Sequence, residues 1–216
     1  MKSMERISVA VALSASLLSA CPVYVWADST EAATESDETE KVNSEKHDFK
    51  SFDWGMKQED IEAVEGTPDV DEEMSNADGK FIAYADRSIA GKKAILAYYF
   101  TNDQFYEARY LLKEDHSLGS SYISDYEDIR EALTSSMGET PKDYVKWDTD
   151  SHEDYYSGRE GDALSYGYLS YATWFAMDNM DVYMFMTADN YDISTTIQFD
   201  SKTIKPGDKD YSGSDW

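Results

Sequence analysis

The stretch WGMKQEDIEAVEGTPD, residues 54–69, determines the fold that the sequence predicts, and a looser copy, YISDYEDIREALTSSMGETPKD, follows at residues 122–143. Each copy reads as a short amphipathic helix that ends at a glycine and is followed by a proline. Glycine readily takes the left-handed conformation that ends helices, and proline cannot continue one. The glycines and prolines are Gly66, Pro68, Gly138 and Pro141. The pattern therefore predicts two helices, over residues 56–65 and 125–137.

Three stretches rich in apolar and aromatic residues follow each helix, and several of them alternate with polar residues as strands with one buried face do. They are residues 80–87, 93–100 and 105–112 after the first helix, and residues 165–177, 181–188 and 191–200 after the second. We therefore expect an α+β fold of two tandem helix-then-three-antiparallel-strand repeats, with the helices packed on one face of a sheet. The first α-β-β-β module would span residues 51–118 and the second residues 119–201, with a polar tail at 202–216.

The opening of the first module resembles the outer-membrane-assembly lipoprotein modules of the BamE (SmpA/OmlA) family, in which a Gly-Met pair leads into a short helix that ends in Gly-x-Pro. The matching residues are Gly55, Met56, Ile61, Val64, Gly66 and Pro68. A tandem pair of such modules is similar in layout to the β-lactamase-inhibitor-protein family. The resemblance implies a helix-on-sheet α+β fold and a binding or scaffolding role in a secreted or lipid-anchored bacterial protein.

Residues 1–27 form a targeting segment. A positively charged start is followed by a short apolar run at residues 7–18, which is the secretory pattern and is too short to span a membrane. Two forms of processing remain open: lipidation at Cys21, which follows Leu-Ser-Ala, or an ordinary signal-peptidase cut after Ala27. Cys21 is the only cysteine, so the mature chain would have no disulfide. Residues 28–50 are acidic and poor in apolar residues, which predicts a disordered tether.

The chain carries 44 acidic and 19 basic residues and a formal net charge of −25 at pH 7. Such a charge repels nucleic acid and anionic lipid and favours solubility. The charge therefore predicts no nucleic-acid partner. The targeting segment predicts an extracytoplasmic protein, either secreted or lipid-anchored at the cell surface, and no later apolar stretch is long enough for a transmembrane span.

The acidic stretch at residues 148–162 has the spacing of a calcium loop at its start. Asp148, Asp150 and His152 stand at positions 1, 3 and 5, and they form a weak candidate Ca²⁺ site. An EF-hand would next need glycine and glutamate where Glu153 and Arg159 stand, so a solvated acidic loop is the alternative. We expect no other cofactor.

Aromatic residues gather on the stretch YGYLSYATWF, residues 166–175, and they fall on both faces of the strand expected there. Core packing and strand propensity account for aromatic residues in a sheet. The functional alternative is an aromatic sheet face that binds a partner, since Tyr and Trp are favoured at interfaces. Its candidate binding residues are Tyr166, Tyr168, Tyr171 and Trp174.

Signatures of catalysis are lacking in the sequence, which has neither a Gly-x-Ser-x-Gly motif nor a glycine-rich phosphate loop. We therefore expect an exported, non-enzymatic binding or scaffold module at the bacterial cell surface, whose partner is an extracellular protein, peptide or glycan. The alternatives are an inhibitor of a secreted enzyme or an envelope assembly factor and, third, a carboxylate-based hydrolase. An exposed, contiguous aromatic patch would favour the first two functions, and a deep pocket with converging carboxylates would favour the third.

Overall fold

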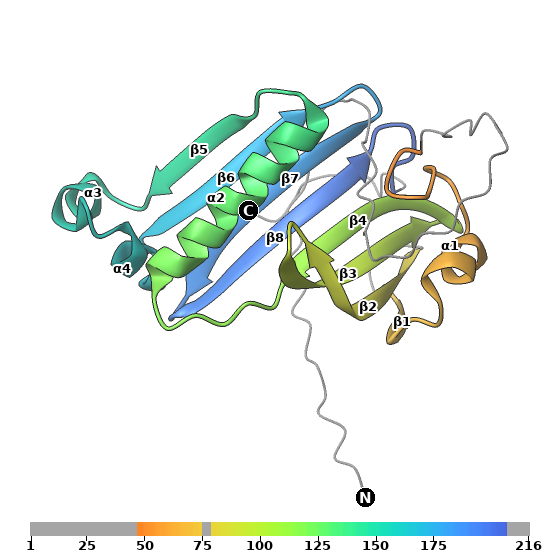
Figure 1. Ribbon diagram of the computed structural model, residues 1–216, viewed down its shortest axis with the longest axis horizontal. Helices are drawn as coiled ribbons and strands as arrows, with labels where there is room; N and C mark the ends of the chain where they lie inside the picture. Colours follow the sequence, from red (N-terminus) through yellow and green to blue (C-terminus); the bar gives the residue numbers. More distant parts are fainter. Residues whose placement is uncertain (1–46, 75–78, 207–216) are drawn as a thin grey trace, which may run out of the picture.

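The computed structural model describes residues 47–74 and 79–206, which form a single eight-stranded antiparallel sheet with four helices (Figure 1). In chain order the elements are α1 (Gln58–Glu65), β1 (Val70–Glu73), β2 (Gly79–Ile89), β3 (Lys92–Thr101), β4 (Gln104–Leu112), α2 (Gly119–Met137), β5 (Lys142–Trp147), α3 (Asp150–Tyr156), α4 (Glu160–Ser165), β6 (Leu169–Ala176), β7 (Met180–Asp189) and β8 (Asp192–Ser201).

The strands lie in the order β1-β2-β3-β4-β8-β7-β6-β5. The chain builds the first four strands as consecutive neighbours, crosses through α2 to the far edge, and returns strand by strand to the middle. There β8 pairs with β4, with Ala108 opposite Phe199. This pairing makes the sheet continuous from one edge to the other.

The predicted fold of two tandem helix-then-three-strand repeats is therefore wrong. The structure has one sheet, and its edges are formed by two strands that the sequence pattern did not indicate, β1 and β5. Most residues of β1 and β5 are exposed, so neither strand shows the alternation of apolar and polar residues that marks a half-buried strand. The acidic stretch expected to be a loop also contains two short helices, α3 and α4.

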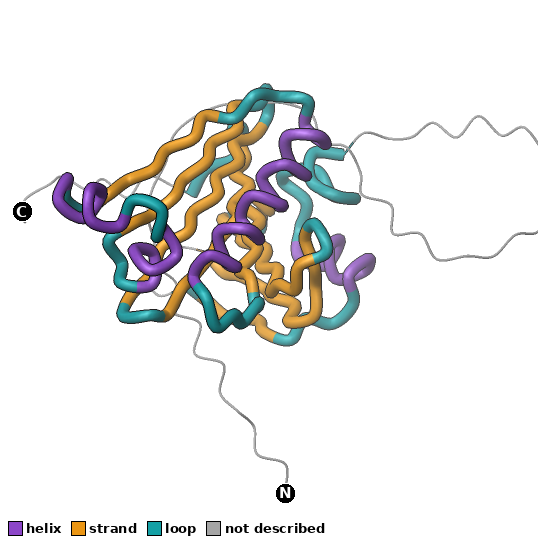
Figure 2. The backbone as a smooth tube through the Cα atoms, turned by 60° about the vertical axis from the view of Figure 1, so that its left-hand side comes forward, coloured by secondary structure: helices purple, strands orange, loops and turns teal. Residues whose placement is uncertain are grey.

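Two different parts of the chain cover the face of the sheet that carries the main core. Over β6, β7 and β8 it is covered by α2, which runs along these strands (Figures 1 and 2) and buries Tyr126, Ile129 and Leu133. Over β3 and β4 it is covered by the segment that precedes α1, whose Phe49 and Phe52 are buried in the same core. Phe49 lies inside the range expected to be a tether, so the folded part begins earlier than the composition indicated.

The helix α1 contributes little to this core. Ile61 is fully buried, whereas Val64, which also carries the family resemblance, is 65% exposed. Because α1 has eight residues and buries only one of them, most of its stability must come from its contacts with the rest of the fold.

The helix α2 begins at Gly119, six residues before the predicted start. Its first turn lies directly against α4, because a Cβ on Gly119 would come within 2.0 Å of the Gly161 carbonyl oxygen and a Cβ on Gly161 would come within 2.4 Å of the Ser120 nitrogen. Only glycine allows two backbones to approach this closely. The contact fixes α4, and with it the end of the sheet, to the body of the protein.

Candidate functional site

Six aromatic side chains form a connected cluster where α3, α4 and the β7–β8 hairpin meet, at the end of the sheet beyond β5 (Figure 1). We call this cluster the aromatic corner; its members are His152, Tyr155, Tyr156, Tyr166, Tyr168 and Tyr191. Three of the tyrosines are well exposed: Tyr155 at 66%, Tyr166 at 45% and Tyr191 at 63%. Large contiguous aromatic surface of this kind is uncommon on a protein that has no partner.

The rings touch one another in sequence across the corner. His152 stacks on Tyr168 with centroids 3.9 Å apart, and Tyr168 stacks on Tyr166 at 5.7 Å. Tyr166 in turn meets Tyr191 edge to face at 5.3 Å. On the other side, Tyr156 lies 5.8 Å from Tyr168 and 4.8 Å from Tyr155. These distances are those of favourable aromatic pairs, so the rings support one another's orientation.

Local backbone structure holds these rings in place. Thr149 caps α3 by accepting a hydrogen bond from the His152 amide, with an Oγ1–N distance of 3.2 Å. The hairpin is tied to α4 by a hydrogen bond from the Tyr191 amide to the Ser165 carbonyl, at 3.1 Å. Since α4 itself is fixed against α2, the corner has a rigid support although its side chains are exposed.

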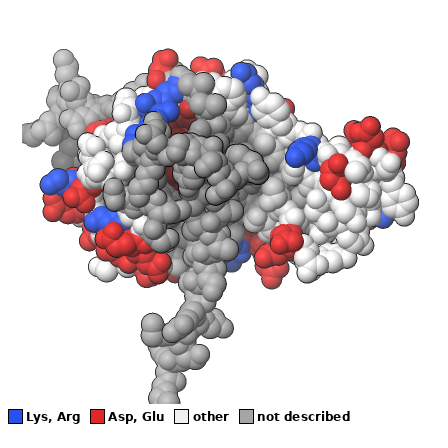
Figure 3. Space-filling model, turned by 180° about the vertical axis from the view of Figure 1, so that it is seen from behind, with Lys and Arg blue, Asp and Glu red and all other residues white. Residues whose placement is uncertain are grey.

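Charge around the corner is almost entirely negative. Arg159 is the only Lys or Arg between residues 147 and 201, and its guanidinium lies over the rings of Tyr155 and Tyr156, 5.4 and 5.1 Å from their centroids. Two of its nitrogens donate hydrogen bonds to Asp162, which raises the pKa of Arg159. The remaining charged residues of this region are carboxylates, and acidic groups border uncharged surface at this end of the molecule in the view from behind (Figure 3).

The structure distributes the four predicted binding residues over three places. Tyr166 and Tyr168 lie in the aromatic corner. Tyr171 lies on the covered face and packs on Tyr126 of α2 at 5.8 Å. Trp174 lies on the opposite face of the sheet, which we call the reverse face, and its Nε1 donates to Asp181 at 3.1 Å. The four residues therefore do not form a single sheet face.

Sequence reasoning missed three members of the corner. Tyr155 and Tyr156 fall in a stretch expected to be a loop, and Tyr191 was expected to begin a strand. The pair of adjacent tyrosines in an otherwise acidic stretch was a usable signal, because exposed loops rarely need two large rings. No local signal pointed to Tyr191, because its place beside Tyr166 depends on how β8 pairs within the sheet.

One candidate calcium residue, His152, is a member of the corner, and Asp148 and Asp150 lie close to it in the chain. His152 is hydrogen-bonded through Nδ1 to the Asp148 carboxylate at 2.7 Å, and its ring is stacked on Tyr168. Asp150 is the first residue of α3. Within residues 47–74 and 79–206, no group of three or more His, Cys, Asp or Glu side chains is arranged to hold a metal ion. Cys21, the candidate for lipidation, lies outside the described residues.

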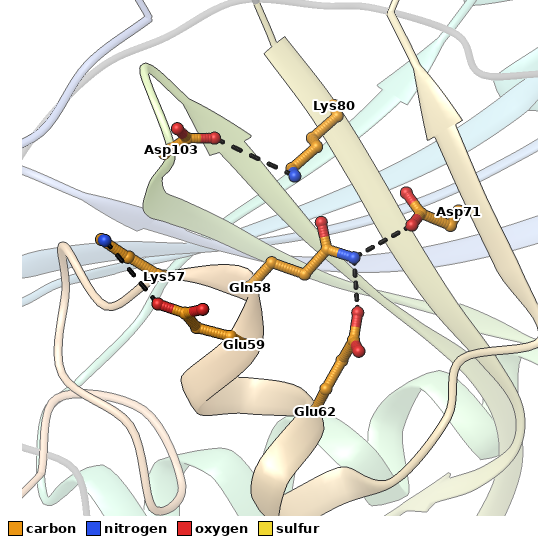
Figure 4. A pocket seen from close by; sticks show the side chains of 7 residues that line it. All are labelled: Lys57, Gln58, Glu59, Glu62, Asp71, Lys80 and Asp103. Carbon is orange, nitrogen blue, oxygen red and sulfur yellow. Dashed lines mark hydrogen bonds and ion pairs between the residues drawn. The ribbon is translucent and has the colours of Figure 1, made fainter.

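A wide, shallow pocket of about 370 Å³ lies elsewhere, between α1 and the strands at that edge of the sheet (Figure 4). It is lined by Lys57, Gln58, Glu59, Glu62, Asp71, Lys80 and Asp103. Its charged groups are paired with one another or with an amide: Lys57 with Glu59 at 3.7 Å, Lys80 with Asp103 at 3.9 Å, and the Gln58 amide with Glu62 and Asp71. This arrangement is a solvated polar network in which Glu62 and Asp71 meet at the Gln58 amide and the other two carboxylates each pair with a lysine.

Buried charges on the reverse face form a second unusual cluster. Glu107 and Arg109 on β4 form an ion pair, and Asp200 on β8 is the register partner of Glu107. Burial, and to a smaller extent the charge of Asp200, raises the pKa of Glu107 to about 7 although Arg109 opposes the shift. Burial also raises the pKa of Asp200 to about 6. Such groups could exchange protons near neutral pH. The pocket in Figure 4 lies elsewhere, beside α1, and Glu107 is buried, so a substrate could not reach its carboxyl group.

No protein-family model, no curated protein sequence and no solved structure matches this chain. The resemblance to BamE-type modules therefore stays a prediction from the residues of the opening stretch. Among the described residues, none of the helices is long and apolar enough to cross a membrane.

Proposed function

We propose that this chain is an exported, non-enzymatic binding module that uses the aromatic corner to hold a partner outside the cytoplasm. The observation that carries the proposal is the contiguity of six aromatic rings, three of them between 45% and 66% exposed, on an otherwise acidic surface. Tyr and Trp dominate binding hot spots because they offer large apolar area with few rotatable bonds. The targeting segment at residues 1–27 supports the location.

The architecture supports the same proposal. A binding surface needs side chains held in place before the partner arrives, since ordering them on binding weakens affinity. Here the rings are stacked on one another, and their backbones are fixed by the close contact of α2 with α4 and by the hydrogen bond from Tyr191 to Ser165. The corner is therefore preorganised in the way that a binding surface requires.

The test compares binding of the purified exported protein to isolated cell envelopes of its source organism, measured by co-sedimentation. The variant Tyr155→Ser/Tyr166→Ser/Tyr191→Ser should lose at least about tenfold in affinity, since hot-spot aromatic residues contribute about 2 kcal/mol or more each. The matched control is Tyr144→Ser, because Tyr144 is 54% exposed but lies on β5 and makes no ring contact within the corner. Equal sedimentation of the triple variant and the parent protein would show that the corner is not the binding surface.

A further inference from the structure

The chemistry of the corner narrows the kind of partner that it can hold, and this step rests on the function proposed above. Its carboxylates come from α3 and the connection before it, from α4, and from the strand ends that flank Tyr191; they are Asp148, Asp150, Glu153, Asp154, Glu160, Asp162, Asp189 and Asp192. Arg159 is the only cationic side chain in this set of elements. An acidic border around exposed aromatic faces complements a positive charge and repels a negative one.

The chain itself shows which group fits. The Arg159 guanidinium lies over two rings of the corner, at 5.4 Å from Tyr155 and 5.1 Å from Tyr156, while two of its nitrogens donate to the Asp162 carboxylate at 3.0 and 3.1 Å. One guanidinium is thus bound both by two ring faces and by a carboxylate. This combination is how proteins recognise arginine and lysine side chains and quaternary ammonium groups.

The other half of the corner has the same parts without a cation of its own. Tyr166 and Tyr191 are exposed rings that meet at 5.3 Å, and Asp189 and Asp192 flank Tyr191 in the hairpin. Among the described residues, no Lys or Arg lies over either of these rings. We propose that the aromatic corner binds a basic segment of an extracytoplasmic partner protein, with a lysine or arginine side chain of that segment seated on Tyr166 and Tyr191.

Tyr191 provides independent support. It has φ 72°, and its neighbour Asn190 has φ 48°, so both residues of this two-residue turn are in the left-handed region. Glycine is the usual residue at the second position of such a turn, and a bulky side chain there is an outlier. The ring gains little from burial, because it is 63% exposed. An unfavourable backbone position that keeps a large ring in solvent is typical of a residue retained for binding.

The experiment measures binding of a fluorescent peptide, four repeats of Gly-Ser-Arg, to the purified exported protein by anisotropy at physiological salt. The net charge of −25 attracts any cationic peptide, so the informative variants leave charge unchanged. Tyr166→Ala/Tyr191→Ala should bind the peptide about tenfold more weakly, since two cation–π contacts are lost. The control Tyr144→Ala should bind it as the parent protein does.

A second variant tests the role of the internal guanidinium. Arg159→Ala removes the chain's own cation and opens the faces of Tyr155 and Tyr156, so it should bind the peptide several-fold more tightly than Lys113→Ala, which makes the same change in net charge outside the corner. A peptide of four Gly-Ser-Glu repeats and a neutral chitin hexasaccharide are the comparison probes, and neither should bind.

Equal affinity of the parent protein and Tyr166→Ala/Tyr191→Ala for the arginine peptide would overturn the inference, because the attraction would then be due to net charge alone. Binding of the hexasaccharide in place of the peptide would also overturn it, while loss of envelope binding in the triple serine variant would still uphold the proposed function. If that variant retains envelope binding, the proposed function fails as well.

Discussion

Two aromatic clusters on the same sheet, one over its middle strands and one beyond its β5 edge, show how residues of one kind acquire opposite roles. Around Phe105, the rings of Phe49, Tyr98 and Trp54 lie 4.7 to 6.2 Å from its centroid, and Phe105 is fully buried. In the aromatic corner the rings of neighbouring residues lie 3.9 to 6.2 Å apart, yet three of them are largely in solvent. Ring-to-ring contact therefore does not by itself indicate a core.

The difference lies in what stands behind the rings. In the first cluster the segment from Phe49 to Trp54 closes over the sheet, so water is excluded from Phe49, Tyr98 and Phe105, and these rings gain the free energy of burial. In the corner, two short helices and a hairpin hold the rings outward, and the surrounding carboxylates keep the surface wet. The first cluster stabilises the fold, whereas the second leaves apolar area for another molecule.

The largest effect that separates the two clusters should come from truncating one ring in each. Phe105→Ala leaves a cavity among packed rings and should lower the free energy of unfolding by about 3–5 kcal/mol. Tyr155→Ala removes an exposed ring and should change it by less than about 0.5 kcal/mol. Urea unfolding followed by circular dichroism measures both. Similar losses in the two variants would show that the corner belongs to the core.

The contrast between the clusters could be predicted only in part from the sequence. The six strands of the interior were located to within a few residues, because alternation marks strands that bury one face. The sequence pattern did not indicate the edge strands β1 and β5, because nearly all of their residues are exposed and no buried face imposes an alternation. Local sequence patterns could not show whether the strands form one sheet or two, since this depends on the pairing of β4 with β8, which are distant in the sequence.

The site was harder to predict than the fold. Tyr166 and Tyr168 were among the expected binding residues, but Tyr171 and Trp174 lie on opposite faces of β6, as alternation along a strand requires for residues three apart. A correct count of strand parity would have separated these two. The sequence could not show that α3 and Tyr191 contribute rings to the corner, because this depends on how α4 packs against α2. That packing requires the close approach of Gly119 and Gly161, which are more than forty residues apart in the chain.

On the reverse face, the buried carboxyl group of Glu107 and the partly buried one of Asp200 make the free energy of unfolding depend on pH. Because the folded pKa of Glu107 is raised to about 7, the folded state binds more protons than the unfolded chain between about pH 4.5 and 7. Stability should therefore fall as pH rises through that window, by up to about 3 kcal/mol at 1.4 kcal/mol per pKa unit. Asp200, with its pKa raised to about 6, acts in the same direction.

Unfolding midpoints in urea at pH 5 and pH 7.5 measure this slope. Glu107→Gln removes the titrating group and keeps an oxygen for Arg109, so the slope should flatten. The control Asp115→Asn changes an exposed carboxyl and should leave the slope as it is. A slope that persists unchanged in Glu107→Gln would show that Glu107 is not its source and would assign the effect to Asp200 and to general repulsion among the acidic residues.

A smaller loss is expected from a single hydroxyl of the buried cluster. Tyr98 donates a hydrogen bond to the Glu65 carboxylate at 2.5 Å, and Lys50 and Arg87 also contact that carboxylate. Burial alone would raise the pKa of Glu65, but the hydrogen bonds from Lys50 and Tyr98 lower it.

Tyr98→Phe keeps the ring and removes only this hydrogen bond, so the free energy of unfolding should fall by about 1.5–3 kcal/mol, as for hydrogen bonds to charged groups. Thermal unfolding of Tyr98→Phe and Tyr144→Phe gives the comparison, because the Tyr144 hydroxyl lies on an exposed edge strand. Equal melting temperatures for the two variants would show that Lys50 and Arg87 satisfy Glu65 without Tyr98.

The smallest effect should appear at the hairpin that completes the aromatic corner. Tyr191→Gly replaces a bulky residue at φ 72° with the residue that this conformation favours, while the unfolded chain gains freedom and the contact with Tyr166 is lost. These contributions nearly offset one another, so the free energy of unfolding should rise by less than about 1 kcal/mol, measured by urea unfolding. The equivalent turn between β3 and β4, Asn102 and Asp103, supplies the control, since Asp103→Gly also relieves a left-handed residue but removes no ring. A stability loss in Tyr191→Gly with a gain in Asp103→Gly would mean that the Tyr191 ring holds the corner together, and the distinction between a stabilising cluster and a binding cluster would then fail at this residue.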